Sequence, residues 1–195
     1  MDYNDIDLSM IDRAIDVMLD GGVIIYPTDT IYGLGVNVFD IGAVNRVYAL
    51  KMRDSFKPIS VCCHSIQSIS YLTDLDQRNR LILEKYLPGP FTFVLYKKNI
   101  VPRVLTKNSN KIGVRIPNND IAIELSRIFP ITTTSANLSS EKTLDTPKKI
   151  AKQLDFRVDL AIDAGSLKSE YSSTVVDLTK RTPEILREGL GNFDF

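Results

Sequence analysis

The sequence has few of the residues on which metal, thiol and histidine chemistry depend. Its 195 residues include one histidine, His64, and two cysteines, Cys62 and Cys63, which are direct neighbours. Neighbouring cysteines cannot join distant segments, so we expect no disulfides and a reducing, cytoplasmic location. A lone histidine without a spaced pair of cysteines also argues against a zinc site.

Long apolar runs and an excess of charge are absent as well. No apolar stretch approaches the ~18 residues that a membrane span needs. The first ten residues, MDYNDIDLSM, are acidic and lack the basic-then-apolar form of a signal peptide. Lys plus Arg and Asp plus Glu each number 24, so the formal net charge is zero. We therefore expect no membrane contact and no global attraction to nucleic acid, and any basic site must be local.

Short apolar runs alternate with stretches of helical periodicity along the chain. Helices are predicted over residues 9–22, 40–51, 75–87, 120–129 and 146–154. Strands are predicted over residues 23–27, 59–63, 91–97, 111–117, 131–135, 160–163, 173–178 and 184–188. The order predicts an α/β domain with a twisted, mixed parallel and antiparallel open sheet flanked by helices. The longest stretch without a predicted element is residues 99–110.

Hydroxyl-rich segments lie where predicted strands begin or end. Residues 132–140 read TTTSANLSS, residues 26–35 read YPTDTIYGLG, and residues 171–178 read YSSTVVDL. Such segments are common as solvated turns. Strand-end hydroxyls and open backbone N–H groups also hold phosphate oxygens without a charge, and ligands of open α/β sheets bind beyond strand ends.

Cations occur beside these segments. Lys51 and Arg53 lie two residues apart in KMRDSFKP, so they point to one side if this segment is extended, and two such cations need an anion. The alternative is that they only satisfy the last carbonyls of the preceding helix. Arg115 lies near the end of an apolar strand, where it is either part of a structural ion pair or a ligand for a carboxylate.

A nucleophile elbow, a metal cluster and a usable pair of acid–base histidines are all missing from the sequence. What remains is a set of cations and hydroxyls at strand ends. That combination suits positioning and electrostatic catalysis on phosphates.

Six segments, taken together, resemble the threonylcarbamoyl-AMP synthase family, the YrdC-like domain, from about residue 10 to residue 191. In chain order they read YPTDTIYGLG, KMR followed by KPIS, PGPFTFVL, VRIP, TTTSAN, and STVVDL with ILREG. The resemblance implies a basic cavity and a nucleotidyltransferase that joins L-threonine, bicarbonate and ATP into threonylcarbamoyl-AMP and pyrophosphate. Mg²⁺ would be held mainly by the ATP phosphates. The product would feed threonylcarbamoyladenosine formation on tRNA through a partner transferase, with a possible weak contact to tRNA.

The resemblance also implies roles for individual residues. Lys51 and Arg53 would be catalytic. The ATP site would be formed by Arg53, Lys57, Lys111, Ser135, Asn137, Thr143 and Arg187. The L-threonine site would be formed by Thr30, Cys62, His64, Arg115, Thr133 and Ser173.

The chain departs from the family pattern in two ways. Many members carry a histidine where this chain has Cys62, and His64 follows two residues later. Residues two apart on a strand share a face, so either Cys62 or His64 is expected to fill that role. Longer members also carry a linker and an extra C-terminal domain, whereas this chain is expected to be one YrdC-like domain over residues 1–195.

Two other functions stay open at this point. One is an RNA-binding module of the same fold without adenylation activity, although the sequence has no basic run interleaved with aromatic residues. The other is a paralogue that handles carbamoyl-adenylate with another acceptor, like the related domain of hydrogenase maturation proteins.

Overall fold

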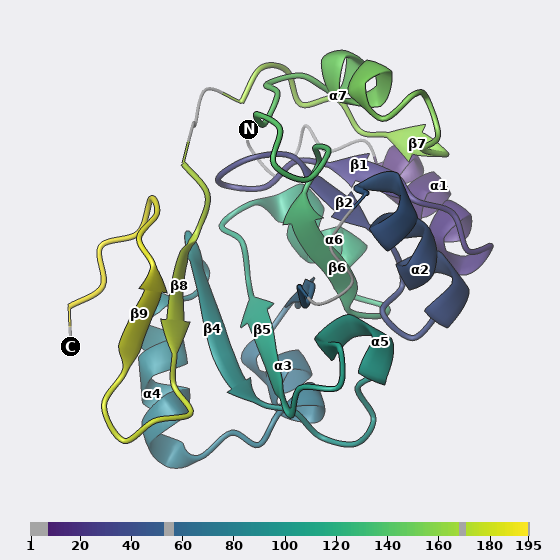
Figure 1. Cartoon of the computed structure of the whole chain (residues 1–195). Helices are drawn as coiled ribbons and strands as arrows, with labels where there is room; N and C mark the ends of the chain where they lie inside the picture. The colour runs from purple at the N-terminus through teal and green to yellow at the C-terminus, as the bar shows by residue number, and fades with distance from the viewer. Residues whose placement is uncertain (1–7, 53–56, 168–170, 195) are drawn as a thin grey trace.

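The computed structural model of the protein describes residues 8–52, 57–167 and 171–194. A mixed nine-stranded sheet runs through it in the order β7-β1-β2-β6-β3-β5-β4-β8-β9 (Figure 1). The strands are β1 Ile24–Tyr26, β2 Gly33–Gly35, β3 Ser60–Cys62, β4 Phe91–Tyr96, β5 Lys111–Arg115, β6 Ile131–Ser135, β7 Leu160–Ala161, β8 Thr174–Asp177 and β9 Glu184–Arg187. Neighbours are parallel in the pairs β7–β1, β3–β5 and β4–β8 and antiparallel elsewhere, which confirms the predicted mixed sheet.

Four of the helices begin at a side chain that accepts a hydrogen bond from a free backbone N–H group. The helices are α1 Leu8–Leu19, α2 Ile41–Leu50, α3 Ile66–Leu72, α4 Gln77–Tyr86, α5 Arg103–Thr106, α6 Asp120–Leu125 and α7 Pro147–Gln153. Asp40 caps α2 by accepting a hydrogen bond from Ala43 N at 2.9 Å, as the sequence predicts. Ser65, Asp76 and Asn119 cap α3, α4 and α6 in the same way.

The two faces of the sheet carry different cores because side chains alternate along each strand. On β3, Val61 belongs to the larger core and its neighbour Cys62 to the smaller one. Apolar residues of α1 and α6 cover the smaller core, above β1, β3 and β6. The same face continues over β5, β4 and β8, where it carries Gly113 and Arg115, Thr92 and Val94, and Val175 and Asp177.

Three elements lie where the sequence predicted none. Strand β2 consists of Gly33, Leu34 and Gly35, a run too short to show strand periodicity. Helix α3 has seven residues, and α5 is a single turn inside the stretch 99–110. Each forms mainly because neighbouring elements hold it, which local sequence patterns do not report.

One predicted helix is shorter than expected. Helix α6 ends at Leu125, four residues before the predicted end at 129. The Ser126 hydroxyl donates to the carbonyls of Ala122 and Ile123 at 2.9 and 3.1 Å, which competes with continued helix formation. Across the described ranges, no helix combines the length and the apolar character needed to cross a membrane.

Candidate functional site

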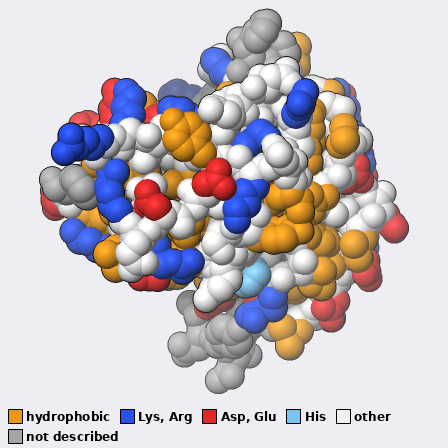
Figure 2. Space-filling model, turned by 90° about the horizontal axis from the view of Figure 1, so that it is seen from below, with side chains coloured by type: hydrophobic (Ala, Val, Ile, Leu, Met, Phe, Trp, Pro, Cys, Tyr) orange, Lys and Arg blue, Asp and Glu red, His pale blue; other side chains and the backbone are white. Residues whose placement is uncertain are grey.

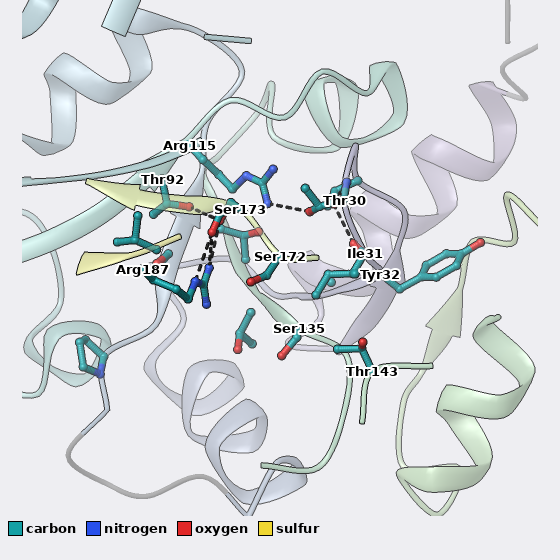
Figure 3. A pocket seen from close by; sticks show the side chains of 17 residues that line it. Thr30, Ile31, Tyr32, Thr92, Arg115, Ser135, Thr143, Ser172, Ser173 and Arg187 are labelled. Carbon is teal, nitrogen blue, oxygen red and sulfur yellow. Dashed lines mark hydrogen bonds between the residues drawn. The ribbon is translucent and has the colours of Figure 1, made fainter. Parts of the chain in front are cut away.

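A cavity of about 280 Å³ opens on the part of the sheet that α1 and α6 leave uncovered (Figure 3). Its walls come from strand ends and from the loops after β1 and before β8. It is lined by Thr28, Thr30, Ile31, Tyr32, Gly33, Pro58, Ser60, Thr92, Arg115, Thr133, Thr134, Ser135, Thr143, Ser172, Ser173, Val175 and Arg187. Hydroxyl groups dominate this list, and its two cations are both arginines.

The hollow exists because small side chains occupy adjacent positions on this face. Ser60 pairs with Thr133 across β3 and β6, and Gly33 pairs with Ser135 across β2 and β6. At Gly113 an added Cβ would lie 2.6 Å from the Ser60 hydroxyl oxygen, so only glycine leaves room for that side chain. The floor of the cavity therefore consists of small side chains, several of which carry a hydroxyl group.

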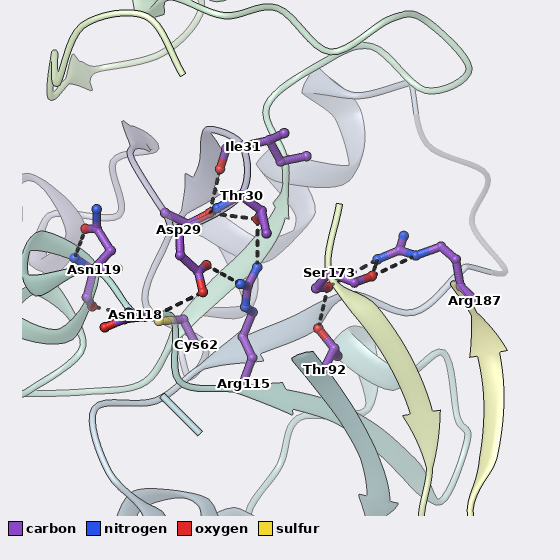
Figure 4. A network of polar contacts seen from close by, with 12 residues as sticks. Asp29, Thr30, Ile31, Cys62, Thr92, Arg115, Asn118, Asn119, Ser173 and Arg187 are labelled. Atoms are coloured by element: carbon purple, nitrogen blue, oxygen red, sulfur yellow. Dashed lines mark hydrogen bonds and ion pairs between the residues drawn. The ribbon is translucent and has the colours of Figure 1, made fainter. Parts of the chain in front are cut away.

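Arg115 stands at the end of β5 and is 5% exposed. Its Nη2 lies 2.5 Å from the Asp29 carboxylate, and its Nη1 lies 3.4 Å from the Thr30 hydroxyl (Figure 4). The other Asp29 oxygen accepts the backbone N–H of Asn118 at 3.0 Å. Arg115 is thus part of a buried ion pair and also lines the cavity, so the predicted ion pair is confirmed and the role as a carboxylate ligand stays a prediction.

The loop after β1 presents Thr30 to this cavity. The Thr28 hydroxyl donates to the Ile31 carbonyl at 2.7 Å and accepts the Thr30 N–H at 3.1 Å. The two threonine hydroxyls lie 3.0 Å apart. This local turn fixes the Thr30 hydroxyl beside the guanidinium of Arg115.

A second arginine borders the opposite side of the cavity. Arg187 donates through Nε and Nη2 to the Ser173 carbonyl at 3.2 and 2.7 Å (Figure 4). The Ser173 hydroxyl lies 2.8 Å from that of Thr92. Gly189, two residues after Arg187, lets the chain after β9 pack closely against the Ser172 backbone, because an added Cβ would lie 2.3 Å from the Ser172 carbonyl oxygen.

Lys51 is placed differently from the sequence expectation. It ends helix α2 in helical conformation, so the segment is not extended at Lys51, and its side chain is buried at 1% exposure. Its Nζ donates to the Ser135 carbonyl, and to the Asn137 carbonyl and side-chain oxygen at 2.8 and 3.0 Å. Lys51 therefore lies behind the turn that carries Ser135 and is not an exposed cation on the cavity wall. Arg53, its predicted partner, lies outside the described residues.

Cys62 is the last residue of β3 and His64 lies in the bend that follows, so they do not share a strand face as expected, although both contact backbone carbonyls of α6 or its C-cap. The Cys62 thiol faces the Ala122 carbonyl at 3.8 Å, and His64 Nδ1 lies 3.1 Å from the Ser126 carbonyl. Burial raises the pKa of Cys62 to about 11. Neither side chain lines the cavity, so the structure does not bring this pair to the predicted threonine site.

Of the other predicted site residues, Thr30, Arg115, Thr133, Ser135, Thr143, Ser173 and Arg187 line the cavity together. Lys57 and Asn137 do not line it, although Asn137 holds the turn after Ser135 through a 2.5 Å contact with its hydroxyl. Lys111 lies at the other end of β5, about 13 Å along the strand from Arg115, and forms an ion pair with Asp177 at 2.9 Å.

Several cavity residues were given no site role from the sequence. They include Thr28, Tyr32, Ser60, Thr92 and Ser172, all within or beside the motifs quoted above. Side-chain alternation could have identified one of them. Thr92 lies between Phe91 and Phe93, whose side chains point to the opposite face of β4 and belong to the hydrophobic core. Tyr32 adds rigidity, because its hydroxyl donates to the Gly165 carbonyl at 2.7 Å and accepts the Ala164 N–H at 3.0 Å.

The cavity is suited to binding anions. Two arginines and many hydroxyls supply hydrogen-bond donors, and the carboxylate of Asp29 is already engaged by one of these arginines, Arg115. Within the described ranges, no three His, Cys, Asp or Glu side chains form a cluster that could hold a metal ion. The geometry offers positioning and charge stabilisation rather than a protein nucleophile.

Comparison with known proteins gives relatives over most of the chain. The chain is 38% identical over 176 residues to a putative threonylcarbamoyl-AMP synthase of Methanocaldococcus jannaschii, covering 89% of this chain and 82% of the relative. It is 34% identical over 187 residues to the uncharacterised protein YciO of Escherichia coli, covering 94% and 90%. The threonylcarbamoyl-AMP synthase of Pyrococcus abyssi is 32% identical, and this chain spans about half of its length, 53%.

The fold agrees with these relatives. The crystal structure of P. abyssi Sua5 complexed with L-threonine superposes with a TM-score of 0.88 over 92% of this chain and 54% of that one. The family model of the Sua5/YciO/YrdC domain, described as telomere recombination, matches residues 16–189. The chain therefore belongs to the Sua5/YciO/YrdC family.

Proposed function

We propose that this chain is an L-threonylcarbamoyladenylate synthase, a nucleotidyltransferase that makes threonylcarbamoyl-AMP and pyrophosphate from L-threonine, bicarbonate and ATP. The observation that carries the proposal is the buried Arg115, held by Asp29 at the wall of a hydroxyl-lined cavity. The names of the M. jannaschii and P. abyssi relatives and the threonine complex of P. abyssi Sua5 support it.

At the Arg115 side, the cavity fits the amino acid. A guanidinium has five donors; Asp29 takes one and Thr30 lies at 3.4 Å from a second. The remaining donors match a carboxylate, and in the proposed complex Arg115 binds that of threonine. The hydroxyls of Thr30, Thr133 and Ser173 then surround the rest of the substrate.

At the other side, the cavity fits the phosphates. Arg187 contributes a fixed positive charge, and Ser135 and Thr143 contribute hydroxyls from a second direction. Asn137, through its contact with Ser135, sets the turn that presents this hydroxyl. Lys57, and Arg53 outside the described residues, remain predictions for this region, whereas Lys111 is too far along β5 to belong to it.

The proposed reaction has two bond-forming steps. The threonine amine attacks the carbon of bicarbonate, a C–N bond forms, and water leaves to give a carbamate. A carbamate oxygen then attacks the α-phosphorus of ATP, and the bond to the β-phosphate oxygen breaks with release of pyrophosphate. Mg²⁺ bound to the ATP phosphates would offset their charge, and the side chains here hold the reactants in line and stabilise the added negative charge.

Lys51 then acts by holding the Ser135 turn in place. Its Nζ donates to the Ser135 carbonyl and to the carbonyl and side-chain oxygens of Asn137. The ammonium group therefore lies behind the turn and does not touch the substrate directly. The catalytic role predicted for Lys51 becomes a positioning role in this proposal.

The test is release of pyrophosphate by the purified chain. Release that requires L-threonine, bicarbonate and Mg-ATP together, and stops when any one is omitted, is the expected result. Release that is indifferent to threonine would contradict the proposal. The matched control is Lys148→Met on the exposed side of α7, which should leave the rate unchanged.

The same assay addresses the alternatives. RNA retention without ATP turnover would indicate a binding module. Turnover supported by carbamoyl phosphate but not by threonine would indicate a paralogue with another acceptor.

A further inference from the structure

A second and larger hollow lies at the far end of the sheet from the candidate site. It has a volume of about 610 Å³ and is open to solvent. It lies where β4 and β8 end and α4 begins. It is lined by Asp74, Leu75, Asp76, Arg78, Asn79, Leu95, Tyr96, Lys98, Leu178, Thr179, Lys180 and Arg181. We call it the end groove.

Positive charge gathers around the end groove although the whole chain is neutral. Four of its lining residues are Lys or Arg and two are Asp. Seen from below, Lys and Arg side chains gather on the side of the molecule that carries α4, β8 and β9 (Figure 2). Asp76 is turned toward its own helix, because it accepts the Asn79 N–H at 2.7 Å. The groove therefore presents a local surplus of cations.

The cations differ in how far they are already engaged. Lys98 donates to the Ser70 carbonyl at 2.7 Å, and Lys180 forms an ion pair with Glu184. Arg181 is exposed, and its side chain has no hydrogen-bond or ion-pair partner anywhere in the described ranges. Of these three cations, Arg181 can bind an anion with the smallest loss of existing interactions, because no hydrogen bond or ion pair of its side chain has to break.

An aromatic ring lies among these cations. Tyr96, the last residue of β4, is 43% exposed and lines the groove. Lys111 reaches the same ring, with its Nζ 6.0 Å from the ring centre. A partly exposed ring next to several cations matches the surfaces on which unpaired nucleic-acid bases stack while phosphates contact Lys and Arg.

Asn79 provides an independent sign of a ligand. It is 7% exposed and lines the groove, and its Nδ2 donates to the Leu178 carbonyl at 3.5 Å. That contact orients the amide, and its Oδ1 is left without a hydrogen-bond partner among the described residues. A buried acceptor without a donor is costly, and a base amine or a sugar hydroxyl in the groove would supply the missing donor.

We propose that the end groove binds a single-stranded segment of a polynucleotide, with a base on Tyr96 and the backbone phosphates on Arg181, Lys98 and Lys180. The shared chemistry is an unpaired base plus phosphate, which RNA and DNA both offer. The end groove is separate from the candidate active site, since no residue lines both.

The test uses fluorescence anisotropy with the full chain and labelled single strands of about twelve nucleotides, within the usual site sizes of such surfaces. RNA and DNA of one sequence are compared with the same RNA in a duplex and with AMP as competitor. The expected result is that single strands bind at least about tenfold more tightly than the duplex or AMP. Tighter binding of the RNA strand would assign the Asn79 oxygen to the 2′-hydroxyl, and equal binding would assign it to a base.

Variants locate the binding. Tyr96→Ala should weaken it by about fivefold to a hundredfold, while Tyr96→Phe, which keeps the ring, should retain it. Arg181→Ala should weaken it and reduce the slope of log affinity against log salt by roughly one. Arg13→Ala is the matched control, because Arg13 is an exposed arginine on α1, away from the groove.

Four results would overturn the proposal. They are no measurable binding, unchanged affinity in Tyr96→Ala, equal losses in Arg13→Ala and Arg181→Ala, and a loss caused by Arg115→Lys alone, which would move the site to the other cavity. Pyrophosphate release, measured in parallel, should be unchanged in both groove variants. A chain that fails that assay altogether but binds single strands as described would still support the end groove.

Discussion

The two ends of strand β5 each carry an ion pair, and the two pairs differ in burial. At one end Lys111 and Asp177 lie 2.9 Å apart, and the lysine side chain is 33% exposed while the aspartate side chain is 5% exposed. At the other end Arg115 and Asp29 lie 2.5 Å apart, and their side chains are 6% and 10% exposed. Four residues along one strand separate an ion pair whose cation reaches solvent from an ion pair in which both side chains are largely buried.

The difference shows what burial does to a charge in this fold. An exposed cation keeps most of its hydration, so its partner adds little. A buried cation without its partner would be left uncompensated in a poorly hydrated site, which is strongly unfavourable. The Arg115–Asp29 pair can therefore fix a guanidinium rigidly at the cavity wall, while the Lys111–Asp177 pair leaves its lysine in contact with solvent. Four predictions would break or sharpen this contrast, and a fifth extends it to Lys51.

The largest effect should come from the buried pair. Asp29→Ala removes the partner of Arg115 and should lower the free energy of unfolding by about 3–5 kcal/mol, measured by urea denaturation. If that variant does not fold, Asp29→Asn keeps the shape and should show a smaller loss in the same direction. A loss as small as that of an exposed pair would mean that burial does not distinguish the two ends.

Lys51 is a third buried cation, held by oxygens of Ser135 and Asn137 rather than by a carboxylate. Lys51→Met should lower the free energy of unfolding by about 2–3 kcal/mol, because these acceptors lose a charged donor. Turnover should also fall by roughly 10²–10³, since the Ser135 turn loses its support. Full stability with low turnover would restore the direct catalytic role predicted from the sequence.

Arg115→Lys keeps the charge and loses the planar fork. Threonine binding should weaken by about 1.5–3 kcal/mol, measured by calorimetry, while ATP affinity changes little. An equal loss for both substrates would indicate that Arg115 supports the cavity as a whole and does not bind the threonine carboxylate itself.

At the other end, Lys111→Ala should cost about 1–2 kcal/mol of unfolding free energy, because buried Asp177 loses its cation but keeps its hydrogen bonds from Thr179. Threonine-dependent pyrophosphate release should stay at the wild-type level, since Lys111 lies away from the cavity. A substantial loss of ATP affinity would instead return Lys111 to the nucleotide site where the sequence placed it.

The smallest effect concerns pH. Burial raises the pKa of Asp177, but hydrogen bonds from Thr179 and Lys111 outweigh it, so the pKa lies below its ordinary value. A carboxyl with a lowered folded-state pKa stabilises the fold above its unfolded pKa, near ~3.9, and this contribution is lost as pH falls through the lower folded pKa. Asp177→Asn should therefore cost about 0.5 kcal/mol at neutral pH and nothing at strongly acidic pH. A cost that stays constant with pH would assign it to packing.

Local patterns in the sequence were sufficient for most of the fold. Asp40 marked the start of α2 by capping it, and Pro147 marked the start of α7, where the Thr146 side chain makes no capping hydrogen bond. Alternation along FTFVLY marked β4, because side-chain alternation depends on near neighbours. The strand-end positions of Thr30, Arg115, Ser135 and Ser173 followed from the same patterns, and the structure gathers these residues in one cavity.

Which side chains face solvent, a partner or a ligand was decided only by tertiary structure. Lys51 and Lys111 looked like site cations in the sequence, but packing buries the first behind a turn and strand direction carries the second to the far end of β5. Cys62 shares a face with Arg115, yet α6 covers it. The end groove joins residues 78, 96 and 181, which no local pattern connects. Burial and proximity between distant segments arise from the packing of the whole chain, whereas composition and periodicity report only on near neighbours.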